Sequence, residues 1–331
     1  MSEPLEPLEP LTPQRGPVAY RSPLLDRPGA VHGDGADASV AAHYGSIVAE
    51  QRTLVHGDGF VDLSHRDVVR VSGPDRLTWL HSLTTQYLEG LEPHLPLDLM
   101  ILSPQGRIEH QMSAVDDGET FWMHLEPGAG PALVGFLEGM RFMMRVEVAL
   151  DDSRAVIGRH DIIRGLTWEL IDRASLSEVE GTPVGTWAHD ALRIEAGVAR
   201  FGIDTDERTI PNELGVLGGA VHLDKGCYRG QETIARTHNL GRPPRRLTRL
   251  HLDGSEHLLP DVGSEITLTD GGKVLGRLGS RAVHYELGPI GLALLKRNVD
   301  TGVDLAVGGV AASQEVIVDP DVGLHVRPLR D

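Results

Sequence analysis

The sequence predicts an α+β protein in which two α+β domains are followed by a small β-barrel. Three observations support this. Strand-like and helix-like runs alternate from about residue 40, and hairpin signals join several of the strand-like runs. From residue 247 onward only short strand-like runs remain, a pattern typical of a small barrel. The Gly- and Pro-containing stretch 238–247 separates the mixed helix-and-strand region from the strand-only region and is interpreted as a linker.

The expected domain boundaries follow these changes in the predicted secondary-structure pattern. Residues 1–40 open with a proline-rich PLE repeat that offers no core, so an extended or disordered tail is expected there. Two α+β domains are expected at 41–150 and 151–240, and the barrel at 247–320.

The first domain is predicted element by element from its hydrophobic pattern. A β-rich run covers Asp67–Gly73, and Ser72 or Gly73 ahead of Pro74 marks a helix start. Three strands joined by the turns PQG and DDG follow, then an amphipathic helix and an alternating strand: Leu97–Ser103, Arg107–Val115, Glu119–Leu125, Pro131–Phe142 and Met144–Leu150.

The second domain and the barrel are read in the same way. A strand is expected at Thr167–Asp172 and a helix at Thr186–Gly197, with Gly197 at its C-terminal cap. The barrel strands are expected at Leu247–Leu252, Glu265–Thr269, Lys273–His284, Pro289–Leu295 and Gln314–Val318.

Charge and composition exclude several classes of function. The chain carries 48 acidic and 31 basic residues, a net charge of −17, which disfavours a protein that coats nucleic acid nonspecifically. No apolar run approaches the ~18 residues of a membrane span, so no membrane partner is expected. The N-terminus lacks the features of a secretory signal, so a cytoplasmic location is expected. Nothing in the sequence sets the oligomeric state.

Common catalytic motifs are missing. The sequence contains no P-loop, no G-x-G-x-x-G, no H-E-x-x-H and no G-x-S-x-G. This removes the usual nucleotide-binding, zinc-protease and serine-hydrolase interpretations.

The segment Asp224–Arg236, DKGCYRGQETIAR, holds the single cysteine of the chain, Cys227. It also holds Lys225, one of three lysines against 28 arginines. Two interpretations of Cys227 are open: a small buried core residue, or a thiolate favoured by Lys225, Arg229 or the start of a helix near Gln231. An iron–sulfur cluster commonly takes about four thiolates, so this chain alone is expected to hold no stably bound metal.

The residues around the cysteine also allow two interpretations. Gly226 and Gly230 permit close backbone approach or unusual dihedral angles, and Gln231 and Glu232 either cap a turn or meet a ligand. A purely structural turn entering a helix explains them equally well.

Upstream, Arg193 and Glu195 are candidates on a predicted helix. One carboxylate can accept paired N–H donors from the edge of a flat heterocycle, whereas a solvated helix charge is the plainer alternative for Glu195. An arginine run suggests contact with RNA phosphates or, equally, a solvated linker: Arg236, Arg242, Arg245, Arg246 and Arg249.

The run KGCYRGQE, Lys225–Glu232, resembles the signature of the YgfZ-type folate-binding proteins. The resemblance covers about residues 45–318 and includes four further stretches: Val68–Gln86, Leu102–Ile108, Arg193–Glu213 and Glu286–Arg297.

The resemblance implies a fold, a ligand and a cellular role. The wider superfamily includes the aminomethyltransferase of glycine cleavage, a three-domain cloverleaf around a central folate channel. By resemblance the chain is a tetrahydrofolate-binding accessory protein of iron–sulfur cluster assembly or repair, linked to tRNA modification. Its expected partners are iron–sulfur proteins or cluster-assembly factors.

The same resemblance assigns roles to the candidate residues. Glu195 holds the pterin edge, and Cys227 serves in redox chemistry or transient cluster contact beside Lys225. The other residues assigned to the folate site are Arg193, Gly226, Tyr228, Gly230, Gln231 and Glu232.

Departures from the aminomethyltransferase pattern weigh against its reaction. His110 and Gln111 stand where that enzyme carries an aspartate pair, and a neutral amide cannot stabilise an iminium cation as an anion does. Cys227 likewise replaces a carboxylate. The alternative is a folate-dependent one-carbon transferase or demethylase that uses another acid, such as Glu109.

Overall fold

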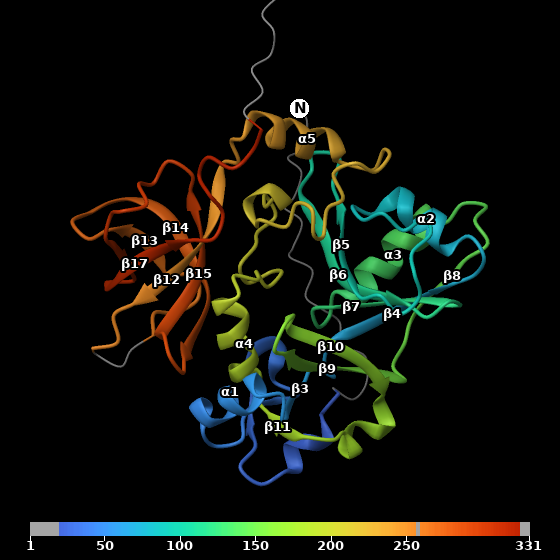
Figure 1. The fold of residues 1–331 in the computed structure, drawn as a ribbon, viewed down its shortest axis with the longest axis horizontal. Coiled ribbons are helices and arrows are strands. Elements are labelled where there is room, and N and C mark those ends of the chain that lie inside the picture. Colours follow the sequence, from blue (N-terminus) through green and yellow to red (C-terminus); the bar gives the residue numbers. More distant parts are fainter. Residues whose placement is uncertain (1–19, 256–258, 325–331) are drawn as a thin grey trace, which may run out of the picture.

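The computed structural model describes residues 20–255 and 259–324, which form three lobes (Figure 1). One lobe is a closed barrel, one is built on a five-stranded sheet and one on a four-stranded sheet. The helix α4 (Thr186–Glu195) lies between the barrel and the four-stranded sheet and contacts both. The predicted α+β class with a C-terminal barrel is therefore confirmed.

The five-stranded sheet is wholly antiparallel and its strands take the order β5 (Leu97–Leu102), β6 (Ile108–Asp116), β7 (Thr120–Leu125), β4 (Asp67–Ser72) and β8 (Glu147–Leu150). Alternate side chains such as Leu99 and Met112 share a core with the two helices on one face, α2 (Arg76–Leu83) and α3 (Gly130–Met140). On the opposite face, Met100 and Leu102 join a second core that includes residues of α4, α5 and the barrel.

Helix α2 starts later than predicted. Its cap is Asp75, not Ser72 or Gly73. Gly73 instead takes a φ of 109°, and a Cβ there would lie 2.2 Å from the carbonyl oxygen of Arg145. The glycine thus serves a close backbone crossing and not a cap.

The four-stranded sheet draws on two separate parts of the chain: β10 (Gly165–Asp172), β9 (Arg154–Asp161), β3 (Gly59–Asp62) and β11 (Thr182–Val184), in that order. Helix α1 (Ile47–Val55) packs against β3 and α4. The sheets therefore do not follow the boundary expected at residue 150, because β3 pairs with strands about a hundred residues further along the chain.

The barrel closes through six antiparallel strands: β12 (Arg245–Leu252), β15 (Gly288–Lys296), β14 (Gly271–His284), β13 (Glu265–Leu268), β16 (Leu305–Val307) and β17 (Val310–Val316). The sequence missed β16, which is only three residues long. The linker expected at 238–247 is shorter than predicted and covers only residues 241–244. Helix α5 (Gln231–Leu240) runs through its first three residues, and β12 begins at Arg245.

Residues 20–46 pack onto the lobes as a short segment that adds two 3₁₀ turns, η1 (Pro23–Asp26) and η2 (Gly35–Asp37), and a small hairpin of β1 (Val31–His32) and β2 (Ala41–His43). Leu24 and Val40 are fully buried. The expected tail of residues 1–40 thus lies in part outside the described residues, and its described part packs because it carries apolar side chains.

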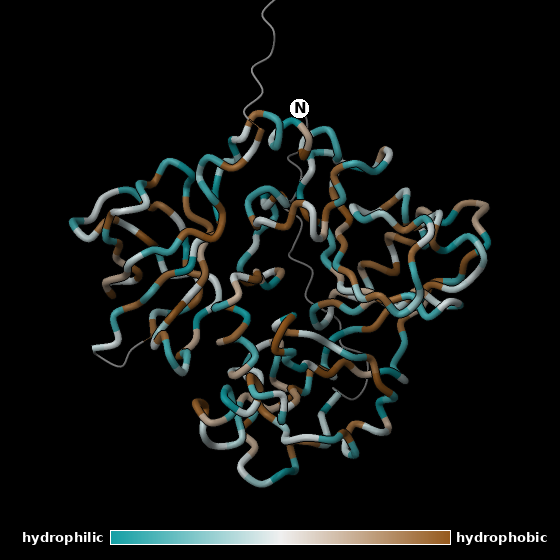
Figure 2. The backbone as a smooth tube through the Cα atoms, viewed as in Figure 1, coloured by the Kyte–Doolittle hydropathy of each residue, from teal (hydrophilic) through white to brown (hydrophobic). Residues whose placement is uncertain are grey.

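Apolar stretches follow the strands inside each lobe, and hydrophilic stretches follow many of the outer loops (Figure 2). The described helices, including the third 3₁₀ turn η3 (Arg173–Glu178) and the fourth, η4 (Pro211–Glu213), include none long and apolar enough to cross a membrane.

Candidate functional site

The signature segment Lys225–Glu232 lies against the turn of the β5–β6 hairpin. Gly230 has a φ of 83°, and a Cβ there would lie 2.4 Å from the carbonyl oxygen of Ser103. Gly106, in the hairpin turn, faces the side chain of Thr233 in the same way. Only glycines allow this close approach, so α5 begins directly against the hairpin.

Cys227 and Gly226 are exposed in the stretch between buried Lys225 and buried Tyr228. Tyr228 belongs to the core shared by α4, α5 and the barrel, and the side chain of Lys225 points inward. The core interpretation of the cysteine is therefore wrong. The loop holds its thiol at the surface.

Lys225 lies against the end of α2. Its Nζ donates hydrogen bonds to the carbonyl oxygens of His81, Thr84 and Gln86, at 2.5, 2.6 and 2.8 Å. The ring of Tyr228 is 5.1 Å from the same nitrogen. Burial lowers the pKa of Lys225 to about 8, while the carbonyl contacts favour its charged form.

Arg229 ties the segment to β6. Its guanidinium forms an ion pair with Glu109 and lies 5.5 Å from the ring of Phe136. Glu109, the acid proposed for alternative one-carbon chemistry, is thus already paired with a cation. Glu232 is exposed at the start of α5, Gln231 reaches the carbonyl oxygen of Lys225 at 3.4 Å, and the space around Gly226 is open.

Glu195 ends α4 on the barrel side, and its side chain is 44% exposed. One carboxylate oxygen lies 3.2 Å from Nε2 of His284. Nδ1 of His284 accepts the backbone N–H groups of Glu286 and Leu287, whereas Nε2 makes no hydrogen bond to any described residue. The carboxylate of Glu195 thus lies beside the histidine and stays accessible.

Arg193 points the other way, into the interior. Its guanidinium contacts Asp190, Asp204, the hydroxyl of Ser280 and a backbone carbonyl. Burial disfavours the cation, but the two aspartates outweigh burial and raise the pKa of Arg193. These contacts hold the last turn of α4 against β14 of the barrel.

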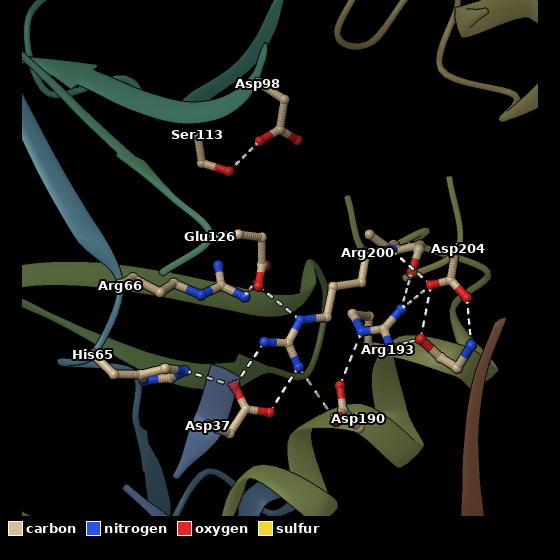
Figure 3. Close-up of polar contacts among 12 residues, drawn as sticks. Asp37, His65, Arg66, Asp98, Ser113, Glu126, Asp190, Arg193, Arg200 and Asp204 are labelled. Atoms are coloured by element: carbon tan, nitrogen blue, oxygen red, sulfur yellow. Dashed lines mark hydrogen bonds and ion pairs between the residues drawn. The ribbon is translucent and has the colours of Figure 1, made fainter. Parts of the chain in front are cut away.

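A charged network that the sequence did not reveal surrounds Arg200 (Figure 3). Arg200 binds both oxygens of Asp37, at 2.6 and 2.8 Å, and Glu126 at 2.7 Å. His65 also reaches Asp37, at 2.8 Å. Burial alone raises the pKa of Asp37, yet the hydrogen bonds from Arg200 and His65 hold it well below its usual range.

The network joins segments that are far apart in the chain. Asp37 comes from the N-terminal segment, Glu126 follows β7 and Arg200 follows α4. The partners are 74 and 163 residues apart in the chain, so no local pattern could have revealed them.

The face of the five-stranded sheet opposite α2 and α3 carries several polar side chains among apolar ones. On β6, His110 faces Phe136 of α3, so alternation places Gln111 and Ser113 on the other face. Ser113 donates a 2.6 Å hydrogen bond to Asp98 and is paired in register with His124 (Figure 3 shows the first contact).

Two polar side chains on this face lack partners among the described residues. Oε1 of Gln111 and both ring nitrogens of His124 are buried without hydrogen bonds. His124 packs edge-on against Trp168 of the four-stranded sheet, with ring centroids 4.5 Å apart. Burial lowers the pKa of His124 well below its usual value, so its neutral ring offers one donor and one acceptor.

Two cavities flank the loop 201–208. One, of about 540 Å³, lies between this loop and the hairpin turn 103–109, and the other, of about 570 Å³, lies between the loop and the barrel. Neither has Glu195 or Cys227 in its lining. The geometry thus groups Cys227 with Lys225, Tyr228 and Arg229, and Glu195 with His284, without a described contact between the groups.

Most of the arginine run is engaged inside the protein. Arg245 pairs with Asp206 and Glu213, and Arg249 pairs with Glu315. Arg246 is fully buried in the barrel. Only Arg236 and Arg242 of the run are exposed, which removes most of the cations from the expected RNA-contacting face.

The fold matches a solved structure over nearly its full length. The glycine cleavage system aminomethyltransferase T from Bartonella henselae superposes with a TM-score of 0.74 at 17% identity, over 91% of this chain and 97% of that one. The chain has the aminomethyltransferase fold.

Sequence relatives point in two directions. An aminomethyltransferase from Nostoc sp. is 26% identical over 306 residues, which cover 76% of this chain and 80% of that protein. A mitochondrial homolog of the iron–sulfur cluster assembly factor IBA57 from Mycosarcoma maydis is 26% identical over 230 residues. That match spans 56% of this chain and 55% of the relative. No family model matches the chain.

Proposed function

We propose that the protein binds tetrahydrofolate and supports the assembly or repair of iron–sulfur clusters through the thiol of Cys227. One observation carries the proposal: the single cysteine is exposed on a loop that buried Lys225 holds on one side and buried Tyr228 on the other. A core cysteine needs no such presentation, whereas a thiol that meets a partner does. The relative named as an iron–sulfur cluster assembly factor supports the same role.

Three side chains, those of Glu195, Gln111 and His124, are suited to a flat, hydrogen-bonding ligand. The accessible carboxylate of Glu195 suits the paired N–H donors along the edge of a pterin. Buried polar groups usually have partners, so the unpaired atoms of Gln111 and His124 are suited to a bound molecule. Arg193 supports Glu195 indirectly, because its hydrogen bonds to Asp204 and Ser280 hold the C-terminal end of α4 in place.

The thiol would act on a cluster that is cargo. A single cysteine supplies one thiolate, so the remaining ligands of a bound cluster come from a partner, a second copy or a small thiol. Iron–sulfur proteins or their assembly factors are accordingly the proposed partners. A link to tRNA modification would run through such a partner, because most of the arginine run is paired internally.

Calorimetric titration with tetrahydrofolate tests the ligand. Glu195→Ala should weaken binding at least tenfold, because a carboxylate that accepts two N–H donors contributes about 1.5–3 kcal/mol per charged hydrogen bond. Glu138→Ala is the matched control, since Glu138 is similarly exposed, at 39%, on the outer helix α3. Equal affinities in the two variants would remove Glu195 from the site.

Cells lacking the protein test the cluster role. We expect Cys227→Ser to fail to restore the activities of iron–sulfur enzymes under oxidative stress, while the wild-type protein restores them. The serine matches the size of cysteine but cannot act as a thiolate. Full restoration by the serine variant would refute the thiol role.

A folate-dependent one-carbon transferase or demethylase is the alternative, and the match to an aminomethyltransferase over 80% of its length favours it. The Arg229 partner of Glu109 stands against Glu109 as its acid. Sustained formation of methylene-tetrahydrofolate from aminomethyl donors, or of methyl-tetrahydrofolate from N-methyl donors, lost in Glu109→Gln, would establish this alternative.

A further inference from the structure

The contacts of Lys225 use the whole ammonium group. A lysine ammonium has three N–H donors, and here three carbonyl oxygens lie within 2.8 Å of Nζ. The residue is only 4% exposed. No donor of Lys225 is left for a ligand in the centre or for the neighbouring thiol.

The acceptors lie where a helix needs a cation. His81 is in the last turn of α2, Thr84 is its C-terminal cap and Gln86 follows. Carbonyl groups at a helix C-terminus lack helical donors and carry the negative end of the helix dipole. The N–H of Thr85, which would serve His81 in a continuing helix, donates instead to Met100 of β5.

The turn after α2 is anchored on its other side as well. The hydroxyl of Thr85 donates to the carbonyl oxygen of Ala220 at 2.7 Å and accepts the N–H of Met100 at 2.9 Å. The N–H of His222 donates to the carbonyl oxygen of Thr85 at 2.9 Å. Lys225 is therefore attached to a turn that the sheet already holds.

Cys227 lies two residues beyond this attachment and one residue before buried Tyr228. Beyond Tyr228, the ion pair of Arg229 with Glu109 and the close contact of Gly230 with Ser103 hold the other side of the loop. The exposed thiol is thus fixed from both directions.

We infer that Lys225 is a positioning residue for Cys227: its ammonium fastens the thiol loop to the end of α2 and contacts no ligand. The functional part of this inference rests on the proposed role of the thiol, while the structural part does not. It also explains why a chain with 28 arginines keeps a lysine here. Three carbonyls converge on one point, which suits a compact ammonium and not a planar guanidinium.

The test compares Lys225→Met and Lys225→Arg with Lys296→Met. Methionine keeps the approximate length of the side chain and removes the donors. Arginine keeps the positive charge but places it on a planar guanidinium, which cannot direct three donors from one point. Lys296 is the matched control, because it is exposed and donates to one carbonyl, that of Val274. All three variants are compared as full-length proteins at neutral pH, after their folded fraction has been checked by circular dichroism.

Hydrogen exchange gives the first measurement. The amides of His222 and Gln231 bracket the loop and donate to Thr85 and Tyr228. We expect both to exchange about tenfold faster or more in the two Lys225 variants, and at the wild-type rate in Lys296→Met. Unchanged exchange in Lys225→Met would overturn the inference, and Lys225→Arg serves the same test if the methionine variant does not fold.

Binding and complementation give the second. Tetrahydrofolate affinity should stay within about twofold in folded Lys225 variants, while iron–sulfur enzyme activities should fall as in Cys227→Ser. Lost folate binding with normal loop exchange would make Lys225 a ligand contact and refute the inference. If Cys227→Ser itself restores activity, the proposed function fails, yet the exchange result still decides the structural part.

Discussion

Replacing Gly230 with alanine should detach α5 from the β5–β6 hairpin. The glycine has a φ of 83°, and a left-handed conformation costs an ordinary residue about 1–2 kcal/mol. The added Cβ would lie 2.4 Å from the carbonyl oxygen of Ser103 and 3.0 Å from Cα of Gly106. Backbone cannot yield as a flexible side chain does, so overpacking adds about 1–3 kcal/mol.

Together these effects predict a loss of about 2–5 kcal/mol in the free energy of unfolding, measured by urea titration. Gly226→Ala is the control within the same signature, because no atom lies within 4 Å of its added Cβ and its φ is not positive. That variant should stay within about 0.5 kcal/mol of the wild type. Equal stability of the two variants would refute the close-approach argument for Gly230.

Three further predictions concern charged residues. Arg245 lowers the pKa of Asp206 to about 2, so this pair stabilises the fold above the ordinary aspartate pKa and loses its effect as pH falls from about 4 to 2. In Asp206→Asn, the urea concentration at the midpoint of unfolding should change less with pH over that interval than it does in the wild type. An equal change in the two proteins would contradict this. Arg200→Met should cost about 3 kcal/mol because it strands the carboxylate of Asp37, and adding Asp37→Asn should recover part of the loss; strictly additive costs in urea titration would show that the pair is uncoupled. Arg246→Met should speed amide exchange in the barrel without altering RNA retention on a tRNA column, and reduced retention would place this buried arginine at an RNA surface.

The sequence predicted the elements whose pattern is local. Alternating residues in β5, β6 and β7 and the hairpin turns between them are visible in one stretch of chain, as is the amphipathic face of α4. The sequence placed the end of α5 too early. Gly and Pro residues beyond the helix suggested a linker that begins at residue 238, whereas α5 continues to Leu240. It also assigned residues 20–40 to a tail, although Leu24 and Val40 are buried there.

The sequence identified candidate residues by their chemistry, but it did not predict the environment of each residue. The segment around Cys227 was conspicuous because the chain has one cysteine and three lysines, but whether the thiol was buried stayed open. Lys225 and Arg193 were assigned to a ligand, and the structure instead surrounds each of them with acceptors from the protein itself. Each set of acceptors includes residues more than 80 positions away.

The sequence by itself determined the α+β class, the barrel and the unusual composition of the signature, because hydrophobic period, turn residues and residue counts are properties of neighbours along the chain. Only the tertiary structure decided that Cys227 is exposed, that Lys225 binds the end of α2 and that Arg200 gathers Asp37 and Glu126. The physical reason is that burial and charge pairing are set by segments that meet in space, and the sequence order does not record those meetings.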